Sequence, residues 1–182
     1  MAVDSGLDDQ DLIGGCLRND RKMQEALYRK YAAEMLRICR SYEPDGDFAK
    51  DILQAAFLKV FRNLKHFSGS GSLQGWIRRI ITNTAIDSFR KRQKAYCLIR
   101  MEDVPVSEEP SCEMPDGDSE GDILQKVALL PDGARHVFNL YALEGLGHKE
   151  IAEMLGISEG TSKSQLNRAR QLLKQQLVGL DL

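Results

Sequence analysis

The chain lacks any apolar run long enough to cross a bilayer, which takes about 20 residues in a helix. Its acidic first residues, 1–11, contain no cationic stretch followed by an apolar one, so they are not a secretory signal. Membrane insertion and export are therefore not expected. The 182 residues, 42% hydrophobic and 29% charged, predict one or two globular domains located in the cytoplasm.

Cysteine and histidine are too scattered to form a metal site or a disulfide framework. The four cysteines include no C-x-x-C pair, and the three histidines are dispersed along the chain. Reduced thiols and no bound metal are the expected state. The sequence also lacks a glycine loop that could cradle phosphate, a paired acid and base, and a Ser/His/Asp grouping. We therefore predict neither enzymatic activity nor a cofactor.

Lysine and arginine are missing from one segment, residues 101–125, although the chain has 25 of them. Three of the five prolines lie in this segment, which has little aliphatic content and cannot build a core. It also holds nine acids, namely Glu102, Asp103, Glu108, Glu109, Glu113, Asp116, Asp118, Glu120 and Asp122. The net charge of −2 therefore hides two mildly basic modules on either side of an acidic stretch. We predict an all-α protein with helical domains at 1–100 and 123–182, joined by a flexible linker at 101–122.

The first module has the apolar spacing of a helical bundle. Apolar residues recur at steps of three and four from Met23 to Tyr42, from Leu53 to Leu64, and from Leu73 to Ala85. If Ile77, Ile80, Ile81 and Thr84 face the core, a basic and polar face lies opposite them, formed by Arg78, Arg79, Thr82, Asn83, Asp87 and Arg90. Six bases and one acid lie between residues 78 and 94, which favours nucleic-acid contact over a merely solvated helix end.

The second module has the pattern of a helix-turn-helix. A short helix at residues 148–155 is followed by Gly156, a residue suited to the left-handed conformation that ends a helix. Ser158 is a good N-cap for a longer helix after it. With Leu166, Ala169, Leu173 and Leu177 inward, the outer face carries Thr161, Ser164, Arg168 and Gln171, flanked by Lys163, Gln165 and Asn167. These hydroxyls, amides and bases are groups that contact base edges and phosphates, so we predict that this helix reads duplex DNA.

Three segments together resemble the extracytoplasmic-function class of bacterial RNA polymerase sigma factors. Residues 51–61 are similar to the family helix that docks on the polymerase clamp. Residues 75–87 are similar to the promoter-melting and minus-ten segment, and residues 150–170 to the helix-turn-helix that reads the minus-thirty-five element. The resemblance implies a factor that binds core RNA polymerase and promoter DNA, without catalysis of its own, and that is held inactive by an anti-sigma factor.

The resemblance also implies particular site residues. Polymerase binding falls on Asp51, Gln54 and Phe57, although core packing is an equally good reading of Phe57. Minus-ten recognition falls on His66, Phe67, Ser68, Arg78, Arg79, Asn83 and Arg90. Minus-thirty-five recognition falls on Thr161, Lys163, Ser164, Gln165, Asn167 and Arg168. Trp76 shares the apolar stripe of its helix, so we expect a core residue rather than a platform for a base.

The sequence departs from the family pattern at a few positions. Ala55 stands where the family usually has an acid, and Ser162 replaces a usual aliphatic on the inward side of the recognition helix. One alternative function is a helix-turn-helix regulator whose first module dimerises or senses a signal. Another is an interaction protein with no role on DNA. Association with core polymerase and specific initiation would distinguish a sigma factor from both.

Overall fold

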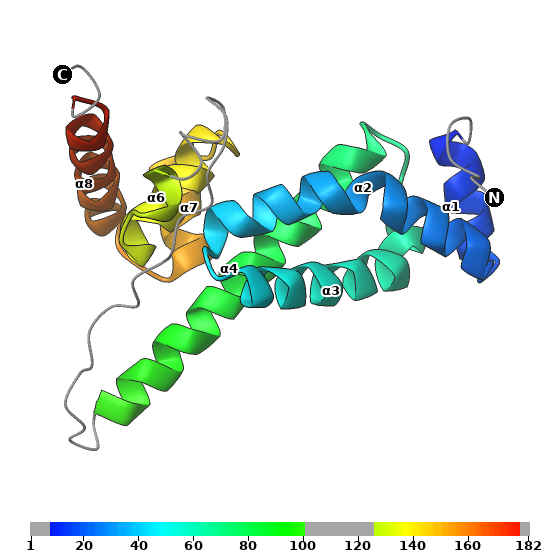
Figure 1. Cartoon of the computed structure of the whole chain (residues 1–182), viewed down its shortest axis with the longest axis horizontal. Coiled ribbons are helices and arrows are strands. Elements are labelled where there is room, and N and C mark those ends of the chain that lie inside the picture. The colour runs from blue at the N-terminus through cyan, green and yellow to red at the C-terminus, as the bar shows by residue number, and fades with distance from the viewer. Residues whose placement is uncertain (1–7, 101–125, 179–182) are drawn as a thin grey trace. The chain divides into compact units, whose positions relative to one another are not determined.

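The computed structural model describes residues 8–100 and 126–178, and over these ranges it is helical with no strand (Figure 1). The all-α prediction is confirmed. The elements are α1 (Asp9–Leu17), α2 (Arg21–Tyr42), α3 (Gly46–Asn63), the 3₁₀ turn η1 (Leu64–His66), α4 (Leu73–Arg100), α6 (Asp132–Ala142), α7 (His148–Leu155) and α8 (Glu159–Val178). The predicted linker, residues 101–122, lies outside the described residues.

The chain forms two compact units, and two helices contribute to both. Unit 1 comprises residues 1–39 and 46–85, and unit 2 comprises residues 40–45 and 86–182. The last turn of α2 and the second half of α4 therefore belong with α6, α7 and α8. The predicted domains differ from this division, because they assign both segments to the first module.

Unit 1 has an apolar core built from the three predicted helical stripes. Leu27 and Met35 of α2, Val60 of α3, and Ile77 and Ile81 of α4 are all fully buried. The buried apolar residues of each of these helices recur at steps of three and four, so they share one face of the helix. Burial of each such side chain stabilises the fold by about 1.5–3 kcal/mol.

Helix α1 is attached to α2 by a close backbone approach and a polar cluster. A Cβ added at Gly15 would lie 2.2 Å from Cγ of Met23, so only glycine fits there. At the other end of α1, Asp9 accepts hydrogen bonds from Lys30 Nζ at 2.8 Å and from the Tyr31 hydroxyl at 2.7 Å. Although burial alone would raise the pKa of Asp9, these two bonds lower it below its ordinary value.

The C-terminal helices of unit 2 enclose a small apolar cluster. Val127, Leu130 and Ala134 pack against Ala169 of α8. Ile151 and Leu155 of α7 are buried as well. Together with the contacts of α7 on α8, this cluster holds α6, α7 and α8 against one another.

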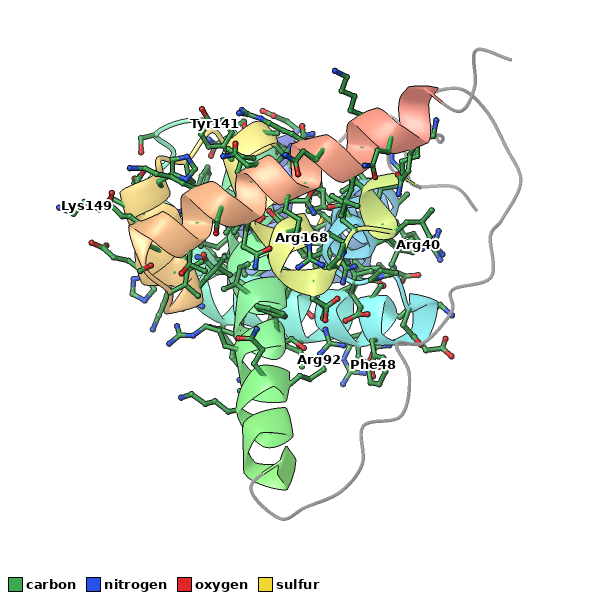
Figure 2. All side chains as sticks on the ribbon, turned by 90° about the vertical axis from the view of Figure 1, so that its left-hand side faces the viewer. Arg40, Phe48, Arg92, Tyr141, Lys149 and Arg168 are labelled. Atoms are coloured by element: carbon green, nitrogen blue, oxygen red, sulfur yellow. The ribbon has the colours of Figure 1, made fainter. Side chains whose placement is uncertain are left out.

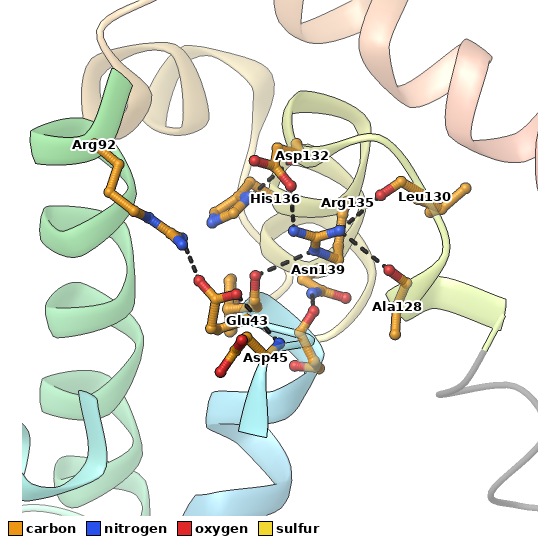
Figure 3. Close-up of polar contacts among 11 residues, drawn as sticks. Glu43, Asp45, Arg92, Ala128, Leu130, Asp132, Arg135, His136 and Asn139 are labelled. Carbon is orange, nitrogen blue, oxygen red and sulfur yellow. Dashed lines mark hydrogen bonds and ion pairs between the residues drawn. The ribbon is translucent and has the colours of Figure 1, made fainter. Parts of the chain in front are cut away.

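Unit 2 also contains a buried polar network around α6 (Figure 3). Arg135 donates from Nε to the carbonyl of Tyr42 at 3.1 Å and from Nη1 to the carbonyl of Leu130 at 2.7 Å. Asn139 donates from Nδ2 to the carbonyl of Ser41 at 2.6 Å. The last carbonyls of a helix have no partner within that helix, and here two side chains of α6 supply partners for those of α2.

The imidazole of His136 is enclosed by aromatic rings in the same network. It stacks on Phe89 of α4 at 3.9 Å and 22° and lies 5.7 Å from the ring of Tyr42. Its Nδ1 lies 2.7 Å from the carbonyl oxygen of Asp132, so Nδ1 carries the proton and donates it. Burial, reinforced by the charge of Arg135, lowers the pKa of His136 to about 4. The ring is therefore neutral near pH 7.

Candidate nucleic-acid interface

The turn between α7 and α8 has the geometry that the sequence predicted. Gly156 adopts the left-handed conformation, with φ 69° and ψ 37°, and its N–H donates to the carbonyl of Ala152 at 2.9 Å. The hydroxyl of Ser158 accepts the N–H of Thr161 at 3.0 Å and caps α8. A glycine turn followed by a serine cap ends one helix and starts the next within three residues. The two helices therefore form a helix-turn-helix.

The outer face of α8 presents polar and basic side chains, and Figure 2 labels Arg168 on this helix. Five of the six predicted residues are exposed, namely Thr161, Lys163, Ser164, Asn167 and Arg168. The ammonium of Lys163 lies 3.9 Å from the carboxylate of Glu159, and both side chains are more than half exposed. Such a surface pair is weak, so it can exchange for a phosphate contact.

Gln165 lies differently from the other predicted residues of α8. It is half-buried, and its amide group would lie 3.4 Å from a Cβ added at Gly133 of α6. Its Oε1 is buried without a hydrogen-bond partner. This contact with α6 turns the side chain away from the exposed face, so Gln165 leaves the candidate set.

The basic face of α4 is largely as predicted. Arg79, Asn83 and Arg90 are exposed, while Arg78 is half-buried. Thr82, expected on this face, is instead 4% exposed. The helical wheel failed there because it was set by residues 77–84, whereas Ala85, Ile86 and Phe89 are also buried and lie three, four and seven positions after Thr82, on the same side of α4.

The loop before α4 and the first turn of α4 together supply an aromatic pair. Phe67 and Trp76 lie 5.5 Å apart, and both are half-buried. The expectation that Trp76 is a core residue is therefore only partly correct. His66 and Ser68 are exposed, and Ser68 shares a 2.7 Å hydrogen bond with the Ser70 hydroxyl. Gly69 and Gly71, with φ of 75° and 94°, allow the loop to turn there.

A third candidate surface lies on α3, where the resemblance implied polymerase binding. Asp51 and Gln54 are exposed. Phe57 is only 2% exposed and packs edge-on against Tyr28 at 4.7 Å, so it is a core residue rather than a surface contact. The structure adds Phe48 and Leu58, which are 54% and 57% exposed.

Phe48 and Leu58 were missed by the sequence analysis, although a signal for them exists. On a helical wheel Leu58 falls with Asp51 and Gln54 on the polar side of α3, opposite its buried stripe, and Phe48 falls at the edge of that side. Large apolar side chains on the polar face of an amphipathic helix indicate a protein contact. The four residues together define the α3 surface.

The described residues contain no group of three His, Cys, Asp or Glu side chains that could hold a metal ion. Two of the cysteines, Cys16 and Cys39, are buried and unpaired. Burial raises the pKa of the Cys16 thiol to about 11 and that of Cys39 to about 12, so both stay protonated at neutral pH. Within residues 8–100 and 126–178, no helix combines the length and the apolar character that crossing a membrane requires.

Two family models match the chain. Sigma-70 region 2 matches residues 27–95, and Sigma-70 region 4 matches residues 120–173. The first match includes the α3 surface and the basic face of α4, and the second includes the helix-turn-helix.

Individual relatives agree with these matches. The chain is 32% identical over 162 residues to the ECF RNA polymerase sigma factor SigE of Mycolicibacterium smegmatis. The aligned region covers 85% of this chain and 61% of that protein. It is 28% identical over 183 residues to the RNA polymerase sigma-H factor of Pseudomonas aeruginosa, covering 94% and 95% of the two chains.

A solved structure shows the same fold. The sigma factor RpoE, crystallised in complex with the anti-sigma factor NepR from Bartonella quintana, matches with a TM-score of 0.53 at 21% identity. The match covers 87% of this chain and 98% of RpoE. With sigma-70 regions 2 and 4 present in this order, the chain belongs to the sigma-70 family of RNA polymerase sigma factors, in its extracytoplasmic-function class.

Proposed function

We propose that this sigma factor contacts a promoter through two separate faces, one on α8 and one on α4, and contacts core polymerase through the α3 surface. The observation that carries the proposal is the helix-turn-helix of α7 and α8, whose exposed side carries hydroxyl, amide and basic groups. Such a helix enters the major groove and reads base edges. Members of the family are initiation factors, so the proposal assigns all catalysis to the polymerase.

The exposed residues of α8 divide into those that contact bases and those that contact phosphates. Arg168 and Asn167 are exposed and carry groups that form bidentate bonds to guanine and adenine. Lys163 lies in the first turns of α8, where an ammonium contacts phosphate as a point charge. We assign Thr161 and Ser164 to the same minus-thirty-five surface.

The α4 face and the loop before it suit a melted minus-ten strand. Arg79 and Arg90 supply positive charge along the exposed side of α4, and Asn83 supplies an amide between them. Proteins that bind single strands combine positively charged side chains along the backbone path with aromatic rings on which bases stack. The half-buried pair of Phe67 and Trp76 offers aromatic rings of this kind, and His66 and Ser68 are adjacent to Phe67 in the chain. Arg78, which is half-buried, belongs to the edge of this surface.

The α3 surface suits a protein partner rather than DNA. It combines exposed apolar side chains at Phe48 and Leu58 with Asp51 and Gln54. Apolar anchors surrounded by polar groups are typical of protein interfaces. We assign this surface to core polymerase.

We also propose that an anti-sigma factor binds this chain, because the Bartonella relative was crystallised in complex with one. We place the chain in the cytoplasm, where the polymerase and the chromosome are. For the domain boundaries we keep residues 1–100 and 123–182, with the acidic stretch 101–122 between them.

Two substitutions on α8 test the minus-thirty-five assignment. In a complex with core polymerase, Arg168→Ala should weaken binding by about 1–3 kcal/mol and relax preference at one base position. Lys163→Ala should weaken binding to all sequences and lower its salt dependence. Lys174→Ala, an exposed base farther along α8, is the control. Equal and sequence-blind effects of Arg168→Ala and Lys163→Ala would refute the assignment of roles.

The α3 assignment has its own test. Gln54→Arg should lower affinity for core polymerase and leave the helical circular dichroism unchanged, because Gln54 is exposed. Gln10→Arg, an exposed glutamine on α1, is the matched control. Unchanged polymerase affinity would remove Gln54 from the docking surface.

A chain that binds promoter DNA specifically as a dimer without polymerase would support the alternative function, a helix-turn-helix regulator.

A further inference from the structure

A buried hydroxyl in the helix-turn-helix has its partner on the opposite helix. Ser162 is fully buried, and its own N–H bonds to the carbonyl of Ser158 at 3.0 Å. Its Oγ lies 2.9 Å from Nδ1 of His148, the first residue of α7. The bond therefore joins the first turn of α7 to the first turns of α8, at the end of α8 that carries Thr161 and Lys163.

His148 is itself held in place by the third helix of the domain. Its ring stacks on Tyr141 of α6 at 5.3 Å and 25°. The guanidinium of Arg170 lies 5.5 Å from the centre of the Tyr141 ring, on the same α8 helix as Ser162. Tyr141, labelled in Figure 2, is 38% exposed. His148 is therefore fixed between Tyr141 of α6 and Ser162 of α8.

The bond constrains α8 in a way that apolar packing does not. Leu166 and Ala169 hold α8 against the domain through non-directional contacts, which permit small rotations of the helix about its axis. A hydrogen bond is directional and weakens steeply when its geometry is lost. Ser162 lies between Thr161 and Lys163, so a change in its position moves the side chains that face DNA.

We propose that His148 and Ser162 are positioning residues for promoter reading. Their bond fixes the rotation of α8 and thereby sets discrimination at the minus-thirty-five element. This inference rests on the proposed role of α8 in reading DNA. Loss of the bond lowers the preference for the correct sequence and leaves affinity for unrelated DNA nearly unchanged.

The test uses the full chain bound to core polymerase and two DNA probes. One is a promoter selected by the wild-type complex from a randomised pool, and the other is the same promoter with its minus-thirty-five element scrambled. The measured quantity is the ratio of the two affinities. Ser162→Thr and Ser162→Val form a matched pair, because the two new side chains have the same shape and only threonine keeps the hydroxyl. The threonine variant should keep the ratio within about two-fold of wild type, and the valine variant should lower it about five-fold.

A double-mutant cycle covers the case in which the added methyl disturbs the core in both variants. His148→Ala and Ser162→Ala should each lower the ratio about five-fold, and the double variant should be no worse than either alone. Additive effects of His148→Ala and Ser162→Ala, or equal ratios for threonine and valine, would overturn the inference. Wild-type complexes that show no preference between the two probes would instead refute the role of α8 itself.

Discussion

The two units of this sigma factor differ in what lies inside them. In the described part of unit 1 the buried polar side chains are Thr82 and Thr84, and Thr84 bonds to the carbonyl of Ile80 in its own helix at 2.7 Å. In the described part of unit 2 they are Ser41, Glu43, Arg135, His136, Asn139 and Ser162. The bonds of Arg135, Asn139 and Ser162 reach other helices.

This difference teaches where each unit is vulnerable. Apolar packing is non-directional, so unit 1 should lose stability mainly when volume changes. A buried polar group that loses its partner carries the whole desolvation penalty, so unit 2 should lose stability when one side chain or one proton changes. The only tryptophan of the chain, Trp76, lies in unit 1, so its fluorescence reports on that unit.

The largest expected effect is the loss of Arg135. Arg135→Met keeps the bulk of the side chain but leaves the carbonyls of Tyr42, Ala128 and Leu130 without this donor. We expect unit 2 to lose about 3 kcal/mol. Amide hydrogen exchange of α6 to α8 measures the loss, and Arg40→Met, at an exposed arginine, should change stability by less than about 0.5 kcal/mol. A loss below about 1 kcal/mol for Arg135→Met would contradict the importance of the network.

Mild acid, between pH 6.5 and 5, should have the next largest effect, and it should act on unit 2. His136 has a pKa of about 4 in the fold, against an ordinary value of 6.5, because burial disfavours the charged ring. Between pH 6.5 and 4 the unfolded chain binds a proton that the folded chain does not, so stability falls as the pH falls. The expected loss is about 2 kcal/mol at pH 5, measured by amide exchange of α6.

The groups around His136 in this experiment are Arg135, Arg92 and Asp132, with Phe89 and Tyr42 against the ring. His136→Gln removes the titrating group and should remove the decline between pH 6.5 and 5. Trp76 fluorescence should report no matching loss in unit 1. In unit 1, the lowered pKa of Asp9 places the loss of its contribution below pH 3.8. A pH 5 loss that persists in His136→Gln would assign the acid sensitivity to another group.

A change of side-chain volume should matter most in unit 1. Gly15→Ala places a Cβ 2.2 Å from Met23 Cγ and should lower stability by about 1–3 kcal/mol. Gly14→Ala, one position earlier in α1, meets only the end of Arg18 at 3.5 Å and should raise stability by about 0.5–1 kcal/mol. Urea unfolding followed by Trp76 fluorescence separates the two, and the same sign for both variants would contradict the packing of α1 on α2.

The helices and the turn chemistry could be predicted from the sequence because they depend on local pattern. The helix at residues 148–155, the left-handed Gly156 and the Ser158 cap are all confirmed. Each is decided by neighbours within a few positions, through periodicity or capping.

The features that the sequence could not show depend on contacts between residues that lie far apart in the chain. Phe57 is buried because Tyr28, 29 positions earlier, covers it, and Gln165 is half-buried because it lies against Gly133. The contact between Arg135 and Tyr42 joins residues 93 positions apart. Apolar spacing shows which face of a helix is buried but not which side chain pairs with a polar group there, so the network of unit 2 was missed entirely.

Transcription with core polymerase tests the central assignment most directly, namely that this chain directs initiation through separate faces on α8 and α4. The template is a promoter-length library with randomised sequence upstream of the start site, and transcript ends are mapped by sequencing. The account predicts starts that depend on the chain and lie downstream of two sequence blocks at constant spacing. Arg168→Ala should alter only the upstream block. Starts no more frequent than with core polymerase alone, or a single block unaffected by Arg168→Ala, would contradict it.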